Sequence, residues 1–113
     1  MTQMIVTVFR SRLNPEAQSE YATMAKRMSE LARTIPGYIS HKGFTAEDGE
    51  RVTIVEFESE DALRAWRIHP EHAKAKKHGI ESFFSGYSVQ ICNVLRSRGS
   101  PAKVRAGEPG SGE

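Results

Sequence analysis

Trp66, His69 and His72 lie close together in the chain and are the side chains best suited to chemistry. A neutral imidazole titrates near pH 6.5, so a histidine can take a phenolic proton at neutral pH. An indole can stack on a flat aromatic molecule and orient it. We therefore interpret Trp66 as an orienting residue, His72 as the preferred general base or hydrogen-bond partner, and His69 as its helper.

Each of these residues also has a purely structural interpretation. Trp66 can be a core residue that bridges a helix and the sheet, and His72 can face solvent on a helix. His69 precedes Pro70 and can simply cap the next helix. A metal site at His69, Glu71 and His72 is not predicted, because Pro70 interrupts the helical turn and no third ligand is evident.

Two short helices are predicted to position this stretch. Ser59 is suited to cap the first helix, and Glu60 follows in its first turn, where the positive end of the helix favours an anion. Pro70 disfavours helical backbone at the preceding residue, so this helix ends near residue 68 or 69. Pro70 then begins a second helix that Gly79 closes.

The rest of the chain alternates strands and helices. Asn14 and Pro15 open a long amphipathic helix that ends at residues 35–37, and Gly49 lies in a tight hairpin turn at 47–50. Gly86 indicates a bulge or bend in the final strand. The predicted strands are 4–9, 38–45, 51–57 and 83–95. The order strand, helix, strand, strand, helix, strand predicts an α+β, ferredoxin-like βαββαβ domain with a four-stranded antiparallel sheet.

Composition limits the class of protein. Charged residues make up 27% of the 113 residues and hydrophobic ones 38%, as in ordinary globular domains. We expect one domain at 1–96 and a flexible tail at 97–113, which is rich in glycine, proline and serine. The absence of a long apolar run, the lone Cys92 and the net charge of +2 favour a cytoplasmic protein that binds neither membrane nor nucleic acid.

The predicted strands carry apolar side chains on both faces. Val6 and Val8 lie opposite Ile5 and Phe9 in the first strand, and the last two strands show the same pattern. Two helices can cover only one face of the sheet, and an uncovered apolar face would be adhesive. We therefore expect a homodimer in which a second copy covers the other face.

The turn at 36–38, the run at 57–63, Trp66, the segment 69–72 and the strand 83–95 together resemble the antibiotic-biosynthesis monooxygenase (ABM) family. This family belongs to the dimeric α/β-barrel superfamily, and the resemblance covers about residues 4–96. It implies a dimer whose sheets pack face to face, with a pocket between sheet and helices in each subunit. Some members oxidise phenols, anthrones or quinols with O2 and no cofactor, and others cleave haem. The tryptophan at position 66 is found in the pockets of both groups.

Three positions depart from the patterns of these members. Ala62 stands where the cofactor-free anthrone oxygenases have asparagine, and His72 stands where they have tyrosine. Lys76 replaces the axial histidine of the haem-cleaving members and is a poor iron ligand. The resemblance therefore implies a cofactor-independent monooxygenase acting on a small aromatic phenol, quinol or anthrone. The alternatives are a haem-binding or haem-degrading protein and a non-catalytic protein that binds an aromatic ligand.

Further aromatic side chains are expected to complete the pocket. Tyr38, Phe83 and Tyr87 are predicted to bind the substrate, with the core or the dimer interface as the alternative. We expect Met24 and Met28 to pack in the core. The lysines at 74, 76 and 77 are expected to form a solvated helix end, and the thiol of residue 92 to be buried and inert.

Overall fold

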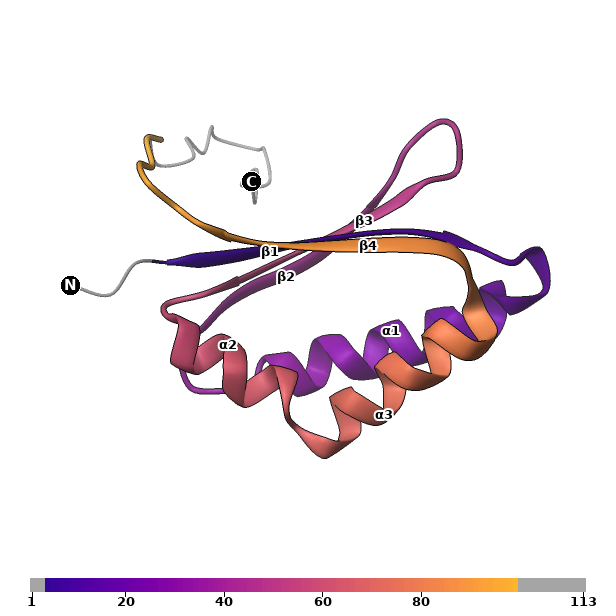
Figure 1. Cartoon of the computed structure of the whole chain (residues 1–113), viewed down its shortest axis with the longest axis horizontal. Coiled ribbons are helices and arrows are strands. Elements are labelled where there is room, and N and C mark those ends of the chain that lie inside the picture. Colours follow the sequence, from indigo (N-terminus) through magenta and orange to yellow (C-terminus); the bar gives the residue numbers. More distant parts are fainter. Residues whose placement is uncertain (1–3, 100–113) are drawn as a thin grey trace, which may run out of the picture.

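A computed structural model describes residues 4–99, in which one antiparallel sheet carries three α-helices on a single face (Figure 1). The strand order β2-β3-β1-β4 confirms the predicted ferredoxin-like α+β fold. Most of the predicted tail, residues 100–113, lies outside the described residues. The elements in chain order are β1 (Ile5–Leu13), a 3-10 turn (Pro15–Ala17), α1 (Gln18–Ala32), β2 (Tyr38–Thr45), β3 (Arg51–Phe57), α2 (Glu60–Arg67), α3 (Pro70–His78), a π-helical turn (Gly79–Phe83) and β4 (Phe84–Asn93).

Strand β1 lies in the middle of the sheet, between β3 and β4. Thr7 is paired with Val55 on one side and with Ile91 on the other, and all three side chains belong to the face under the helices. The β1–β4 register shifts between Arg12 and Leu13, opposite the segment that contains Gly86. The predicted irregularity at Gly86 is thus confirmed.

The predicted break between α2 and α3 is also confirmed. The Ser59 hydroxyl accepts a hydrogen bond of 3.2 Å from the Ala62 amide and caps α2, which ends at Arg67. Pro70 is the first residue of α3, and the Glu71 amide donates to His69 Nδ1 at 3.1 Å. The imidazole of His69 therefore caps α3, which is the structural alternative given for it in the sequence analysis.

Gly79 was predicted to close the helix, but the helical segment continues past it. Its backbone is right-handed helical, and the chain continues from α3 into the π-helical turn. Glycine is required there for a different reason, because a Cβ atom would lie 2.8 Å from the ring of Phe84. Helical segments of the π type are rare and are found frequently at functional sites.

The hydrophobic core gathers where α2 and the end of α1 meet the sheet. Phe57, at 0% exposure, is at its centre, and Leu31, Ala32 and Leu63 pack around it. The middle of α1 does not reach this core. Met24 and Met28 instead face the cavity described below, so the prediction that both pack in the core is wrong for Met24 and only partly right for Met28.

No helix of residues 4–99 covers the other face of the sheet (Figure 1). The side chains of Val6, Val8 and Ile54 alternate with the buried ones and are only partly covered. Cys92, paired with Val6 across β1 and β4, is exposed. The prediction of a buried thiol is therefore wrong within this chain, because the thiol is on the uncovered face.

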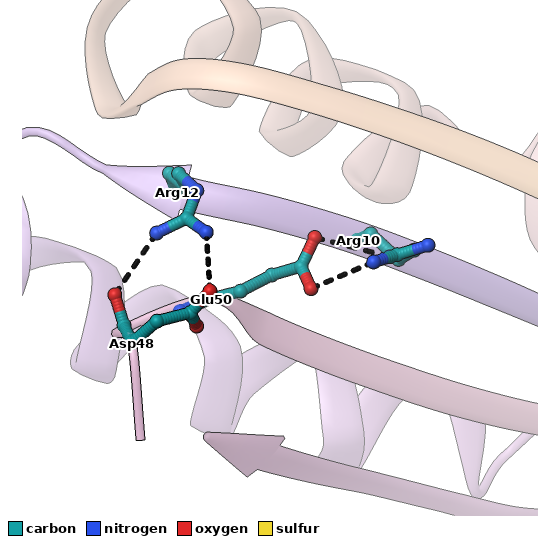
Figure 2. A network of polar contacts seen from close by, with 4 residues as sticks. All are labelled: Arg10, Arg12, Asp48 and Glu50. Atoms are coloured by element: carbon teal, nitrogen blue, oxygen red, sulfur yellow. Dashed lines mark hydrogen bonds and ion pairs between the residues drawn. The ribbon is translucent and has the colours of Figure 1, made fainter. Parts of the chain in front are cut away.

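Two ion pairs join β1 to the β2–β3 hairpin (Figure 2). Arg10 Nη2 lies 2.8 Å from Glu50 Oε1, and Arg12 Nη2 lies 2.8 Å from Asp48 Oδ2. The bond from Arg10 lowers the pKa of Glu50. Exposed pairs of this kind add little stability, but they occupy both carboxylates. The hairpin turn itself is confirmed by Gly49, whose φ is +92°.

None of the helices in residues 4–99 combines the length and the apolar character that crossing a bilayer requires.

Candidate functional site

A cavity of about 520 Å³ lies between the sheet and the helices, within the size range of small-molecule sites. The sheet contributes Thr7, Phe9 and Val55, and the middle of α1 contributes Tyr21 and Met24. Its mouth is bordered by apolar side chains of β4 that are about half exposed, such as Ile91 at 53%. The lining is predominantly apolar and suits a flat hydrophobic molecule.

Trp66 and His72 form one wall of this cavity. Their rings are stacked, with centroids 3.7 Å apart and an interplanar angle of 18°. The indole is only 6% exposed and packs against Phe57 of the core. Because Pro70 begins α3 directly after α2, His72 lies in the first turn of α3 and can fold back onto the indole. The break in the helix thus creates the stacked pair.

Glu71 holds this turn against α1. Its carboxylate receives two bonds from the Arg27 guanidinium, one of them 2.8 Å long between Nη2 and Oε1. This hydrogen bonding lowers the pKa of Glu71. The pair links α1 to the residue next to His72 and so fixes where the imidazole sits. Glu71, weighed above as a metal ligand, is occupied by the arginine.

His41 is a third ring of the site that the sequence analysis missed. It belongs to β2, and its ring meets Trp66 edge-on with centroids 6.0 Å apart and an angle of 82°. His41 is paired with the buried Val55, so it lies on the face under the helices. The signal available was the alternation of the 38–45 strand, which could have placed His41 on that face.

The unpaired polar atoms of the protein gather at this cavity. Five buried side-chain polar atoms of residues 4–99 have no hydrogen-bond partner, and four of them belong to residues that line the cavity. These four are Thr7 Oγ1, Arg51 Nε, Trp66 Nε1 and His72 Nδ1. Each unpaired buried group costs about 1–3 kcal/mol, and these four atoms are enclosed by the walls of the cavity.

Both histidines of the site are neutral at physiological pH. Burial, reinforced by the charge of Lys76, lowers the pKa of His72 to about 4. Burial also lowers the pKa of His41, and the charge of Arg33 acts in the same direction. A neutral imidazole offers one nitrogen as an acceptor, so each ring can receive a proton or a hydrogen bond from a ligand.

The structure separates the predicted site residues into two groups. Trp66, His72, Phe83 and Tyr87 line the cavity together. Tyr38 instead packs edge-on against Phe57 at the margin of the core, with ring centroids 6.3 Å apart. His69 is not among the lining residues and caps α3. Neither Tyr38 nor His69 lines the cavity, so their predicted roles in binding and catalysis are not part of the proposed site.

Ala62 and Lys76, two positions where this sequence differs from the active family members, occupy different surroundings. Ala62 is buried in the core and does not line the cavity. Lys76 does line it, although its side chain is also exposed. The expected solvated helix end is confirmed, since Lys74, Lys76 and Lys77 are exposed near the end of α3, and Lys76 borders the cavity as well.

The fold and the cavity define a small α+β protein with an apolar site between sheet and helices. The sequence matches the family of antibiotic biosynthesis monooxygenases over residues 4–78, and the chain belongs to this family. It is 33% identical over 91 residues to the uncharacterized protein YqjZ of Bacillus subtilis, and the match covers 80% of each chain.

Solved structures show the same fold at lower identity. Rv0793 from Mycobacterium tuberculosis superimposes with a TM-score of 0.76 at 21% identity, covering 85% of this chain and 99% of that one. SnoaB, described as a cofactor-independent oxygenase from Streptomyces nogalater, gives a TM-score of 0.73 at 15% identity, covering 85% and 97%. These likenesses concern the fold.

Proposed function

We propose that this protein is a cofactor-independent monooxygenase that oxidises a small aromatic phenol, quinol or anthrone with O2. The observation that carries the proposal is the neutral imidazole of His72, which is stacked on Trp66 and lines an apolar cavity. Membership in the antibiotic biosynthesis monooxygenase family supports the same class of reaction.

The reaction is balanced without an external reductant when the substrate is electron-rich. An anthrone CH2 group and O2 give a carbonyl and water, so the substrate supplies all the electrons that reduce O2. Removal of one proton leaves a carbanion that transfers an electron to O2, and the two radicals combine to a peroxide. The first proton returns from the base to the peroxide. The second proton is then lost from carbon, the O–O bond breaks, and the hydroxide that leaves takes up this proton to form water. The apolar walls limit hydrolysis and side reactions of these intermediates.

His72 is the proton acceptor in this scheme. Its low pKa shows that an isolated positive charge is disfavoured at this position, mainly because of burial. Proton transfer from a bound substrate forms an adjacent cation and anion without changing the net charge, so their attraction offsets much of that penalty. Trp66 holds the ring plane of the substrate, and the ammonium of Lys76 stabilises the developing anion.

Oxygen uptake by metal-free, flavin-free protein tests the proposal. A panel of anthrones and naphthoquinols is run with the wild type, Trp66→Phe and His72→Ala. A general base contributes about 10²–10⁴-fold, so we expect His72→Ala to lose at least about a hundredfold in kcat/KM. The matched control is His69→Asn, which keeps a side chain able to cap α3 and should retain activity.

Three outcomes would count against the proposed reaction or its proposed base. Uptake by the wild type at the rate of substrate autoxidation, with binding of the same aromatics, would indicate a non-catalytic binding protein. Uptake that persists in His72→Ala would retain the reaction and remove His72 as its base. A Soret band on titration with haem would instead support the haem-binding alternative.

A further inference from the structure

The charges around the cavity all have the same sign. Four basic residues of the helical side line it, and no aspartate or glutamate of residues 4–99 does. The whole chain is nearly balanced, with 16 lysines and arginines against 14 acidic residues, so this bias is local. The four are Lys26, Arg51, Arg67 and Lys76. Lys42 also borders the cavity, but it is paired with Ile54 and its side chain lies on the other face of the sheet, over Phe44. A cavity bordered by one sign of charge attracts ligands of the opposite sign.

Arg51 differs from the other three cations. It is partly buried, whereas the others are exposed. Its Nη1 donates to Thr45 Oγ1 at 2.9 Å, and its guanidinium carbon lies 5.0 Å from the centre of the Tyr21 ring. These two contacts hold the group in place, while its buried Nε has no partner. A guanidinium fixed in this way is prepared to bind a carboxylate.

The acids of the hairpin cannot occupy Arg51. Glu50 is the preceding residue but pairs with Arg10, and Asp48 pairs with Arg12 (Figure 2). Among residues 4–99, Arg51 forms no ion pair with any carboxylate. Arg51 is therefore without a carboxylate partner among these residues, although Asp48 lines the neighbouring pocket with it.

The Arg51 guanidinium and the stacked rings lie along the same face of the sheet. His41 is paired with Val55, and Arg51 lies four residues before Val55 on the same face of β3. The guanidinium extends back towards the rings, because its Nη2 would lie 3.3 Å from a Cβ atom on Gly43, two residues from His41. At about 3.3 Å per residue, about 7 Å of strand separates Gly43 from His41. Phe9, opposite Thr53, adds an apolar side chain at this level. This arrangement suits a flat aromatic molecule with a polar group at each end.

We propose that the substrate is a fused aromatic acid, whose carboxylate binds Arg51 while its ionising hydroxyl or CH2 group faces His72 and Trp66. This inference rests on the proposed function for the identity of the reacting end. The carboxylate of the proposed substrate is inferred from Arg51 and the local positive charge alone, so its binding can be tested without catalytic turnover.

Calorimetric titration in the absence of O2 tests the acidic end. The probes are 6-hydroxy-2-naphthoate and its methyl ester, which differ only in the charge of the group meant for Arg51. We expect the acid to bind wild type at least about tenfold more tightly than the ester, as a hydrogen-bonded ion pair predicts. Arg51→Gln should abolish this preference, and Arg51→Lys should retain part of it. The matched control Arg64→Gln removes an exposed arginine outside the cavity and should keep the full preference.

Equal affinity of wild type for acid and ester would overturn the inference, and this comparison needs no variant to fold. A preference that survives in folded Arg51→Gln but disappears in Lys76→Gln would also overturn it, by placing the carboxylate at the histidine end. Failure of oxygen uptake would leave the acid preference intact, so the two proposals can fail separately.

Discussion

Burial lowers the pKa of His72 to about 4, so the imidazole is neutral at pH 7, with a measurable consequence for activity. Because burial and Lys76 lower the pKa to about 4, the pH profile of kcat/KM should show no inflection from His72 between pH 8 and pH 5. NMR titration of the imidazole would measure the pKa directly. Lys76→Gln removes the nearby charge and should raise the pKa, whereas the exposed Lys74→Gln should not. Titration of His72 near pH 6.5 in the wild type would contradict this.

The same shift makes stability depend on pH. Above pH 6.5 the imidazole is neutral in both folded and unfolded chains, and the full stability is present. As the pH falls from 6.5 towards 4, the unfolded chain binds a proton that the folded site resists, so stability is lost. We expect a contribution of about 1–2 kcal/mol to the loss between pH 7 and pH 5, after allowing for partial exposure. Urea unfolding of wild type and His72→Gln at both pH values measures it, and equal losses in the two proteins would refute it.

At the scale of elements, two glycines with the same backbone conformation should respond differently to alanine. Gly37 has a φ of +91° and Gly49 a φ of +92°, so both substitutions strain the backbone by about 1–2 kcal/mol. A Cβ on Gly37 would also lie 2.7 Å from Ala62 Cβ, where β2 begins beside α2, whereas nothing is within 4 Å at Gly49. We expect Gly37→Ala to cost about 1–3 kcal/mol more in the free energy of unfolding. Equal costs in urea unfolding would show that the contact with α2 relaxes easily.

At the scale of the whole molecule, the uncovered sheet face leads us to propose a homodimer. Val8 and Ile54 are paired across β1 and β3, and both are only partly covered. No helix of residues 4–99 lies on this face (Figure 1). Sedimentation velocity at micromolar concentration should show a dimer for the wild type. A lysine at either position would bury an unpaired charge in the interface and should give a monomer. The matched control Ile68→Lys changes an exposed isoleucine of the helical side and should remain dimeric. A wild-type monomer would contradict the proposal.

Local sequence signals account for most of the elements. The cap at Ser59, the helix start at Pro70 and the turn at Gly49 were all predicted, because each depends on hydrogen bonds or backbone angles within a few residues. The order of strands and helices was predicted for the same reason. The ends of elements were less certain, and at Gly79 the need for glycine comes from Phe84 packing, which no local rule describes.

The residues of the site depended on tertiary structure. Trp66 and His72 could be selected by type and spacing, but their stacking requires the fold-back of α3 onto α2. His41 was missed because it reaches the indole from a strand far away in the sequence. The amphipathic pattern of α1 specified its inward face, yet it could not show that Met24 would border a cavity.

By itself, then, the sequence determined the order of the elements and the fold class, which follow from periodicity and capping, and the family, which follows from shared motifs. Only the tertiary structure decided which inward side chains pack and which leave space, because that depends on how the helices lie over the sheet. It also decided that Arg51 has no carboxylate partner, since Glu50 and Asp48 form ion pairs with arginines of another strand.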